Sequence, residues 1–232
     1  MSAQSLLGRT CVVTGASSGI GEAIAGGLAA RGGAVVGFAR RFRRIGAGDK
    51  PLAGQTLEVH LDVTTERAVE QRFGEVGDID VLVNAAGCGH FGPIARTELS
   101  MLRELLEVHV IGTFLCTRAA LRSMESRRAG HIVNVLSVAA VRSLSDCGAY
   151  TAAKAAQHGL SRVLTEEVRA LGIRVTSLQI GAVDTPIWDT RPGFDRSQMM
   201  RPDEVADVVA DILCRPGVSI DEVVLLPRSG EL

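Results

Sequence analysis

The chain has 232 residues, of which 46% are hydrophobic and 22% are charged, with a formal net charge of −1 at pH 7. This length suits one α/β domain with a substantial core, and no Pro/Ser-rich linker or internal repeat divides it. A net charge near zero argues against a nucleic-acid binder or an anionic-membrane binder, so the expected partner is a small molecule.

The cysteines and the first residues indicate the compartment. Five cysteines are scattered along the chain without a CxxC pair, and no histidine stands at metal-ligand spacing. We therefore expect reduced thiols and no metal site. Residues 1–10 lack the features of a secretory signal, and no apolar run approaches the ~18 residues that span a membrane. These observations predict a soluble, cytoplasmic protein with no membrane partner.

Short apolar runs alternate with stretches of helical spacing. The runs predict strands at 11–13, 34–39, 57–61, 81–83, 131–136, 174–179 and 223–226, with helices at 22–31, 65–73, 100–127 and 149–171. Strands separated by helices pair in parallel, so we predict a Rossmann-like, doubly wound α/β sheet of about seven strands, forming a single domain over residues 1–232. Ligands of such sheets bind beyond the carboxyl ends of the strands.

A glycine-rich turn follows the first predicted strand and opens the first helix. It reads Thr14-Gly15-Ala16-Ser17-Ser18-Gly19-Ile20-Gly21. Glycines permit a tight turn and a close approach of pyrophosphate to the backbone N–H groups at the helix start, where the helix dipole favours anions. The context predicts that a dinucleotide binds at Gly15, Ser17, Ser18, Gly19, Ile20 and Gly21.

Tyr150, the only tyrosine, stands four residues before Lys154. On a helix such residues share a face, so the ammonium group can reach the phenol oxygen or a nearby ligand. A nearby cation favours phenolate, and each unit of lowered pKa corresponds to about 1.4 kcal/mol. Taken alone, the pair also fits an ordinary helix surface. Together with the other motifs it predicts an acid/base device.

These motifs in their order resemble the short-chain dehydrogenase/reductase family over nearly the whole chain. Its TGxxxGxG turn corresponds to residues 14–21 and its YxxxK motif to Tyr150 and Lys154. Three further pieces lie between them: Leu61-Asp62-Val63, Asn84-Ala85-Ala86-Gly87 and Ser137. The resemblance implies that Asp62 faces the adenine amino group with Val63 beside the ring. It also implies that Asn84, Ala85, Ala86 and Gly87 line the cofactor, and that Val183 and Thr185 lie at the nicotinamide end. Without the family, Asp62 would be a helix N-cap and residues 84–87 a simple turn.

The end of the second predicted strand indicates which dinucleotide binds. A carboxylate there would bind the ribose 2′-hydroxyl of NAD, whereas arginine would hold the 2′-phosphate of NADP. Ala39 stands at that place, followed by Arg40 and Arg41 in the basic cluster of residues 40–44. We therefore predict NADP(H) as the cofactor.

The resemblance also implies a reaction, which is hydride transfer between nicotinamide and a carbonyl or alcohol carbon. In reduction, Tyr150 would donate a proton to the developing alkoxide while Ser137 hydrogen-bonds the same oxygen. Lys154 would hold the nicotinamide ribose and lower the tyrosine pKa. From its residue type alone, Ser137 could instead serve a backbone group at a strand end.

The chain departs from the family pattern at two places. His109 stands where the family has an asparagine that organises a proton-relay water, so an imidazole could relay protons there, block the water or simply pack in the core. Ile180 replaces a proline after the sixth strand and should relax that turn. These departures leave open a dehydratase, isomerase or epimerase of the same fold. A non-catalytic nucleotide-binding protein is a further alternative.

Residues 186–200 are expected to form a mobile lid over an apolar substrate, because they hold the only tryptophan, Trp188, with Phe194, Met199 and Met200. The same apolar groups could instead pack on the body or on another subunit. By the resemblance, the ends of the long helices, at 121–128 and 166–171, pair between subunits, so a homodimer or homotetramer is expected.

Overall fold

The computed structural model describes residues 5–43, 50–189, 191 and 193–230. Arg44 of the predicted basic cluster, and residues 190 and 192 of the predicted lid, lie outside the described residues. Among the described helices, none combines the length and apolarity that crossing a membrane requires.

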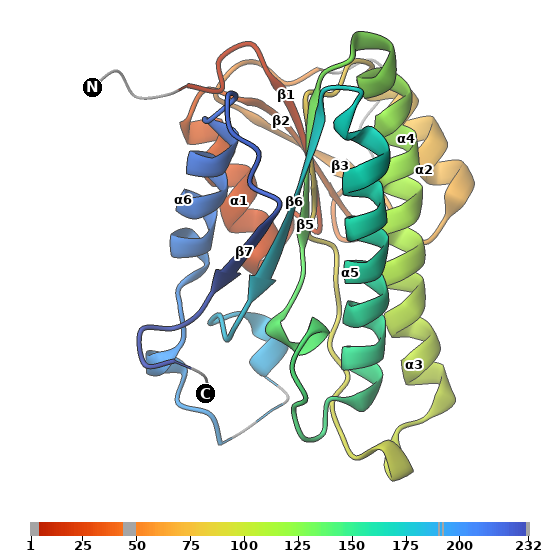
Figure 1. Ribbon diagram of the computed structural model, residues 1–232, viewed down its shortest axis with the longest axis vertical. Helices are drawn as coiled ribbons and strands as arrows, with labels where there is room; N and C mark the ends of the chain where they lie inside the picture. The colour runs from red at the N-terminus through yellow and green to blue at the C-terminus, as the bar shows by residue number, and fades with distance from the viewer. Residues whose placement is uncertain (1–4, 44–49, 190, 192, 231–232) are drawn as a thin grey trace.

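Seven parallel strands form one sheet in the order β3-β2-β1-β4-β5-β6-β7, which confirms the predicted doubly wound, Rossmann-like fold (Figure 1). The strands are β1 (Thr10–Thr14), β2 (Ala34–Ala39), β3 (Thr56–His60), β4 (Val81–Asn84), β5 (Gly130–Val135), β6 (Ile173–Ile180) and β7 (Glu222–Leu225). The central strands are continuous apolar runs because helices bury both of their faces.

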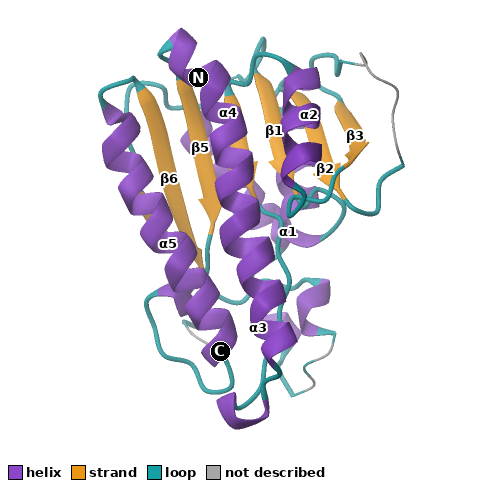
Figure 2. Cartoon of the chain, turned by 90° about the vertical axis from the view of Figure 1, so that its right-hand side faces the viewer, coloured by secondary structure: helices purple, strands orange, loops and turns teal. Residues whose placement is uncertain are grey.

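Helices cover both faces of the sheet. They are α1 (Gly19–Ala30), α2 (Glu66–Val76), α3 (Leu99–Leu106), α4 (Thr113–Arg127), α5 (Gly148–Arg169) and α6 (Pro202–Leu213). α1 and α6 lie on one face, whereas α2, α4 and α5 lie on the other, where Figure 2 shows them in front of the strands.

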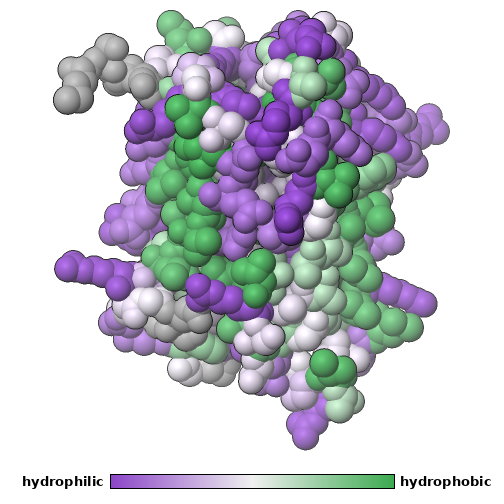
Figure 3. All heavy atoms as spheres, in the orientation of Figure 1, coloured by the Kyte–Doolittle hydropathy of each residue, from purple (hydrophilic) through white to green (hydrophobic). Residues whose placement is uncertain are grey.

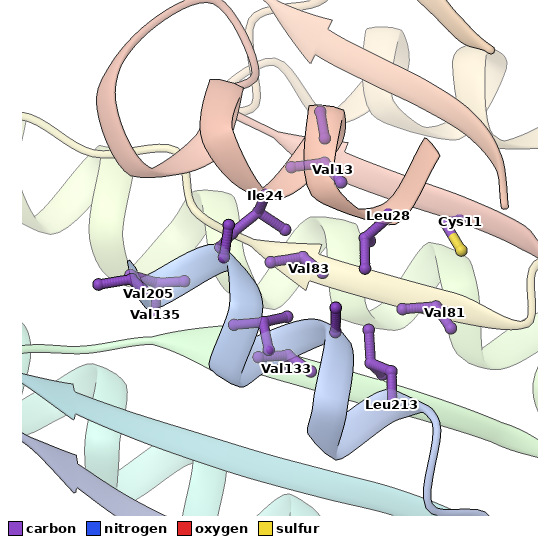
Figure 4. Close-up of a cluster of buried hydrophobic side chains, with 14 of the residues drawn as sticks. Cys11, Val13, Ile24, Leu28, Val81, Val83, Val133, Val135, Val205 and Leu213 are labelled. Carbon is purple, nitrogen blue, oxygen red and sulfur yellow. The ribbon is translucent and has the colours of Figure 1, made fainter. Parts of the chain in front are cut away.

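The core consists of two apolar layers, one on each side of the sheet. Figure 4 shows the first layer, in which Ile24 and Leu28 of α1 and Val205 and Leu213 of α6 meet valines of the strands. The second layer joins the opposite face to α2, α4 and α5. Each fully buried side chain of this kind contributes about 1.5–3 kcal/mol, so the layers hold the strand ends in fixed positions.

Two helical features differ from the sequence-based expectation. The predicted helix over 100–127 is divided by a π-helical turn, Glu107–Gly112, between α3 and α4. α6 was not predicted, although Pro202 stands at its first position and the Glu204 carboxylate accepts a hydrogen bond from the Arg201 N–H at 2.7 Å. Both are typical signals of a helix start.

Candidate active site

A cleft of about 840 Å³ opens at the carboxyl edge of the sheet, where the strand order reverses between β1 and β4. Doubly wound sheets bind their ligands at such a switch point, and the volume is in the range of a ligand pocket. Predicted site residues that line it are Gly15, Ser17, Ser18, Gly19, Ile20, Gly21, Arg40, Arg41, Asp62, Val63, Ala85, Ala86, Gly87, His109, Tyr150, Lys154 and Thr185. The fold therefore gathers most of the predicted residues around one cleft.

The glycine-rich turn has no room for side chains at two of its glycines. A Cβ on Gly15, whose φ is +71°, would lie 2.7 Å from the Ala85 carbonyl oxygen, and one on Gly21 would lie 2.3 Å from the Gly15 carbonyl oxygen. Thr14 fixes the opposite wall, because its hydroxyl accepts hydrogen bonds from the N–H groups of Ala85 and Ala86, both at 3.1 Å. This role of Thr14 was not predicted, although the residue opens the turn.

The two arginines after β2 differ in their contacts. Both are exposed and line the cleft. Arg41 donates hydrogen bonds to the hydroxyls of Ser17 at 3.2 Å and Ser18 at 2.5 Å, so its guanidinium group lies against the glycine-rich turn. Arg41 therefore has the better-fixed position of the two.

Asp62 and Val63 lie in the wall of the cleft. The Asp62 carboxylate accepts hydrogen bonds from the Thr64 N–H at 3.0 Å and the Thr64 hydroxyl at 2.8 Å. This is an Asx turn within the loop after β3, not an N-cap of α2. Val63 is buried against Gly112, where a Cβ would lie 2.7 Å from it.

Asn84 and Val183 lie behind the wall of the cleft rather than in it. The Asn84 amide donates hydrogen bonds to the Thr117 hydroxyl at 3.1 Å and to Asn134 Oδ1 at 2.8 Å, inside the core. The Val183 carbonyl accepts the indole N–H of Trp188 at 2.9 Å. These two residues support the cleft from behind.

Lys154 is buried on α5, next to the cleft. Its ammonium group donates hydrogen bonds to the Val135 carbonyl and to Gln157 Oε1, each at 3.0 Å, and lies 5.9 Å from the centre of the Tyr150 ring. The Gln157 amide in turn donates to the Thr113 hydroxyl at 2.8 Å. Burial lowers the pKa of Lys154 to about 7. Gln157 was not predicted, although it stands three residues beyond Lys154 on the same helix face.

The phenol of Tyr150 is a weaker acid than an ordinary tyrosine. Burial raises its pKa to about 12, and the hydrogen bond with Ser137 only partly opposes this. The sequence-based expectation was the opposite, that Lys154 lowers this pKa. Burial penalises both the phenolate and the ammonium group that would stabilise it. Ser137 also accepts a hydrogen bond from the Ala139 N–H at 3.1 Å, so it serves the backbone as well as the phenol.

His109 lies in the π-helical turn with 1% of its surface exposed. Nε2 and the Cys88 carbonyl oxygen are 2.8 Å apart, and because a carbonyl only accepts, we assign the proton to Nε2. Nδ1 is then an acceptor, and it has no hydrogen-bond partner among the described residues. Burial and the nearby Lys154 lower the His109 pKa to about 3, so the ring is neutral. Its edge meets Tyr150 at a centroid distance of 5.7 Å.

The described part of the predicted lid approaches Tyr150 through Phe91. The guanidinium group of Arg191 lies 4.4 Å from the centre of the Phe91 ring, and that ring lies 5.2 Å from the Tyr150 ring. Trp188 and Phe194 pack together at 4.9 Å. Pro186 and Ile187, at the start of this segment, line the cleft.

The sequence predicted that Ile180, in place of a proline, relaxes the turn after the sixth strand, but the structure shows a fixed segment there. It is the last residue of β6, pairs with Leu225 of β7 and is buried. The next residue, Gly181, donates its N–H to the Leu225 carbonyl at 2.8 Å. Pairing with the neighbouring strand fixes this segment in place of a proline ring.

The parallel sheet and the cleft at its switch point define a Rossmann-like α/β protein. The chain matches the short chain dehydrogenase family over residues 9–193, and it belongs to this family of oxidoreductases. An uncharacterized oxidoreductase of Staphylococcus epidermidis is 32% identical over 224 residues, which cover 94% of this chain and 97% of the relative.

Solved structures agree with this family assignment. An alcohol dehydrogenase of the archaeon Thermococcus sibiricus, complexed with 5-hydroxy-NADP, has a TM-score of 0.84 at 28% identity, over 97% of this chain and 98% of its own. A metagenomic short-chain oxidoreductase in complex with NADP has a TM-score of 0.79 at 32% identity, over 96% and 98%.

Proposed function

We propose that the protein is an NADPH-dependent reductase that converts a ketone or an aldehyde to an alcohol, and that it also runs in reverse. The observation that carries this proposal is that one cleft holds an arginine-flanked glycine turn together with Tyr150 and Lys154, and that Ser137 is hydrogen-bonded to Tyr150. The two solved structures bound to NADP-type cofactors support the choice of nucleotide.

The residues of the cleft fit a dinucleotide. Gly15 and Gly21 permit a turn that is too tight for any side chain, and the first N–H groups of α1 face an anion favourably. Arg41, with Arg40 beside it, would hold the 2′-phosphate through charge-assisted hydrogen bonds. Asp62 and Val63 would hold the adenine, and Thr185 the nicotinamide amide.

When bound, the reduced nicotinamide supplies a hydride to the carbonyl carbon. The protein must supply the proton. Tyr150, with its pKa raised to about 12, is a neutral phenol at physiological pH and can donate its proton to the developing alkoxide. Ser137 would hold the same oxygen by a hydrogen bond. Lys154 would bind the ribose hydroxyls and replace the proton that Tyr150 gives away.

His109 is the residue that would complete this proton path. Its Nδ1 is a buried acceptor with no partner among the described residues, and its ring lies against Tyr150. Since a neutral imidazole with a pKa near 3 does not gain a charge at pH 5 to 8, His109 would position a water or a substrate hydroxyl rather than act as an acid. The unpartnered Nδ1 also keeps a dehydratase or epimerase as the second candidate.

The first experiment is a titration with NADPH and with NADH, read as energy transfer from Trp188 to the reduced nicotinamide. We expect tight, NADPH-selective binding. A screen of ketones and aldehydes then tests turnover, with the loss of NADPH absorbance as the readout. Tyr150→Phe should bind NADPH normally and lose turnover by at least about 10²-fold.

Each alternative gives a different result in the same experiment. NADPH binding with conversion of substrate but no net NADPH consumption would favour an isomerase, epimerase or dehydratase. Binding of neither nucleotide would contradict the proposal and favour a partner-binding protein. Retained turnover in Tyr150→Phe would remove this residue from the mechanism.

We further propose that the enzyme works as a homodimer or homotetramer in the cytoplasm. None of the five cysteines, all within the described residues, forms a disulfide, which suits a reducing compartment. Figure 3 shows hydrophobic side chains gathered over α6 and β7 and again over α5. Val163 on α5 and Val224 on β7 are more than half exposed, at 58% and 51%. Light scattering coupled to size exclusion gives the assembly directly.

A further inference from the structure

Three potential metal ligands lie together at the wall of the cleft. Cys88 and His90 come from the loop after β4, and Glu104 comes from α3. Their ligand atoms all lie within 4.8 Å of one another, and His90 Nε2 is already 2.7 Å from the Glu104 carboxylate. Within the described residues, no other trio of histidine, cysteine and acidic side chains comes this close.

A thiolate, an imidazole and a carboxylate together are a donor set that suits zinc. Zinc bonds of about 2.0–2.3 Å in a tetrahedral arrangement place neighbouring ligand atoms roughly 3–4 Å apart. Ligand atoms within 4.8 Å of one another need only small side-chain movements to reach that spacing. The soft thiolate disfavours magnesium and calcium, which bind oxygen ligands.

Existing contacts hold two of the three ligands in place. The carbonyl of Cys88 accepts a hydrogen bond from Nε2 of His109 at 2.8 Å, and Glu104 lies on the regular helix α3. Solvent reaches the cluster, because 30% of the His90 side chain and 46% of the Glu104 side chain are exposed. An ion can therefore enter without unfolding the loop, and the site is largely preorganised.

We propose that Cys88, His90 and Glu104 bind a zinc-class divalent cation whose remaining coordination position is taken by water, and that the bound ion inhibits the enzyme. Binding forms a sulfur–metal bond, and the thiol proton leaves to solvent. The sequence-based expectation of no metal site arose because Glu104 is distant in the chain and reaches the cluster only through the fold.

Inhibition follows from where the ion would lie, and this part rests on the proposed reductase function. Cys88 is part of the cleft wall, and the His109 ring bonded to it packs against Tyr150. An ion on Cys88 would hold this loop in one position beside the reacting oxygen. Because Cys88 and Tyr150 line the same cleft, the ion would also narrow the space beside Tyr150.

The test uses Co²⁺ as a spectroscopic stand-in for zinc, followed by displacement with Zn²⁺. We expect one equivalent of Co²⁺ to give a near-ultraviolet sulfur-to-metal charge-transfer band that Zn²⁺ abolishes. Cys88→Ser should remove the band. His90→Ala and Glu104→Gln should weaken binding by at least about tenfold. Glu107→Gln, an exposed glutamate three residues beyond Glu104, is the matched control and should bind as the wild type does.

A band that persists in Cys88→Ser, or equal affinities in Glu104→Gln and Glu107→Gln, would overturn the site. In the activity assay, Zn²⁺ should slow NADPH consumption in the wild type and in Glu107→Gln but much less in His90→Ala. Inhibition that is unchanged in His90→Ala would overturn the inhibitory role. If no carbonyl compound is reduced, the reductase function fails while the Co²⁺ spectrum still decides the metal site.

Discussion

At the residue scale, the structure distinguishes the two arginines that the sequence offers for the 2′-phosphate. Only Arg41 is hydrogen-bonded to the serines of the glycine-rich turn. A charge-assisted hydrogen bond contributes about 1.5–3 kcal/mol, so Arg41→Asp should weaken NADPH binding by roughly 10- to 100-fold and leave NADH binding nearly unchanged. Titration of the Trp188 emission measures both.

Arg40→Asp is the matched comparison, since Arg40 lines the same cleft. We expect a smaller loss of NADPH affinity in this variant, because its guanidinium group is less firmly placed. A larger loss in Arg40→Asp than in Arg41→Asp would assign the phosphate to Arg40 instead.

Lys154 should change its charge when the cofactor binds. With a pKa near 7 in the free protein, about nine-tenths of this lysine is neutral at pH 8. The phosphate charges of NADPH favour the ammonium form, so binding should raise the pKa and take up a proton. The chain has only one other lysine, Lys50. Carbon-13 NMR of ε-labelled lysine therefore follows both groups separately.

In this NMR titration, the signal that disappears in Lys154→Met should titrate near pH 7 without cofactor and at higher pH with NADPH. Lys50→Met provides the assignment control. A Lys154 signal that titrates near 10 without cofactor would show that burial does not lower its pKa.

The sequence predicted which active-site residues lie together, but it did not predict how the fold shifts their pKa values. The spacing of Tyr150 and Lys154 predicted that both face one site, because helical periodicity fixes which residues are neighbours. It could not predict the direction of the Tyr150 pKa, because burial depends on packing from other elements. The sequence also could not predict that Nδ1 of His109 lacks a hydrogen-bond partner among the described residues. The tautomer that leaves Nδ1 as an acceptor is set by the hydrogen bond from Nε2 to the Cys88 carbonyl, which only the fold brings close.

At the scale of elements, the π-helical turn is the feature that sequence periodicity missed. Apolar residues recur at helical spacing throughout residues 100–127. The wider π-helical turn within this stretch therefore leaves no clear change in the sequence pattern. The turn nevertheless places Val108, His109 and Gly112 in buried positions facing the cleft and its wall. Such turns are often found at functional sites.

The junction of the glycine turn with α1 allows a paired test on one helix. Gly21→Ala would place a methyl group 2.3 Å from the Gly15 carbonyl oxygen, so the turn must shift. Gly26→Ala would meet nothing within 4 Å. We expect Gly21→Ala to abolish NADPH binding, and Gly26→Ala to bind normally and be stabilised by about 0.4–1 kcal/mol.

NADPH titration and urea unfolding of both variants provide the measurement. Normal NADPH affinity in Gly21→Ala would show that this turn does not hold the pyrophosphate. Destabilisation by Gly26→Ala would contradict the open space found on that face of the helix.

At the scale of the whole molecule, the parallel sheet could be predicted but the strand order could not. Apolar runs separated by helices indicate parallel pairing, and they do so from local sequence alone. The order β3-β2-β1-β4 depends on which side each crossover takes, and this order creates the switch point that holds the cleft. The family resemblance, rather than periodicity, therefore located the site before the structure did.

Two buried histidines should make the stability of the whole molecule depend on pH. Burial lowers the pKa of His109 and of His131, which bonds the Thr176 hydroxyl at 2.8 Å, to about 3 from 6.5. Below pH 6.5 the unfolded chain binds these protons while the folded chain does not. Stability is therefore complete above about pH 6.5 and is lost as the pH falls toward 3.

At pH 5.5, each of these histidines should cost about 1.4 kcal/mol of the free energy of unfolding relative to pH 7.5. Urea unfolding at both pH values measures this loss of stability. In His131→Leu, the loss between pH 7.5 and pH 5.5 should be smaller than in the wild type by about this amount. In the double variant His131→Leu/His109→Asn it should be smaller by the same amount again, because the two sites are independent. Val133→Ala, buried in the same strand as His131, is destabilised without losing a titrating group and should keep the full pH dependence. An equal reduction in Val133→Ala would mean that packing, rather than the neutral imidazole, controls the acid sensitivity.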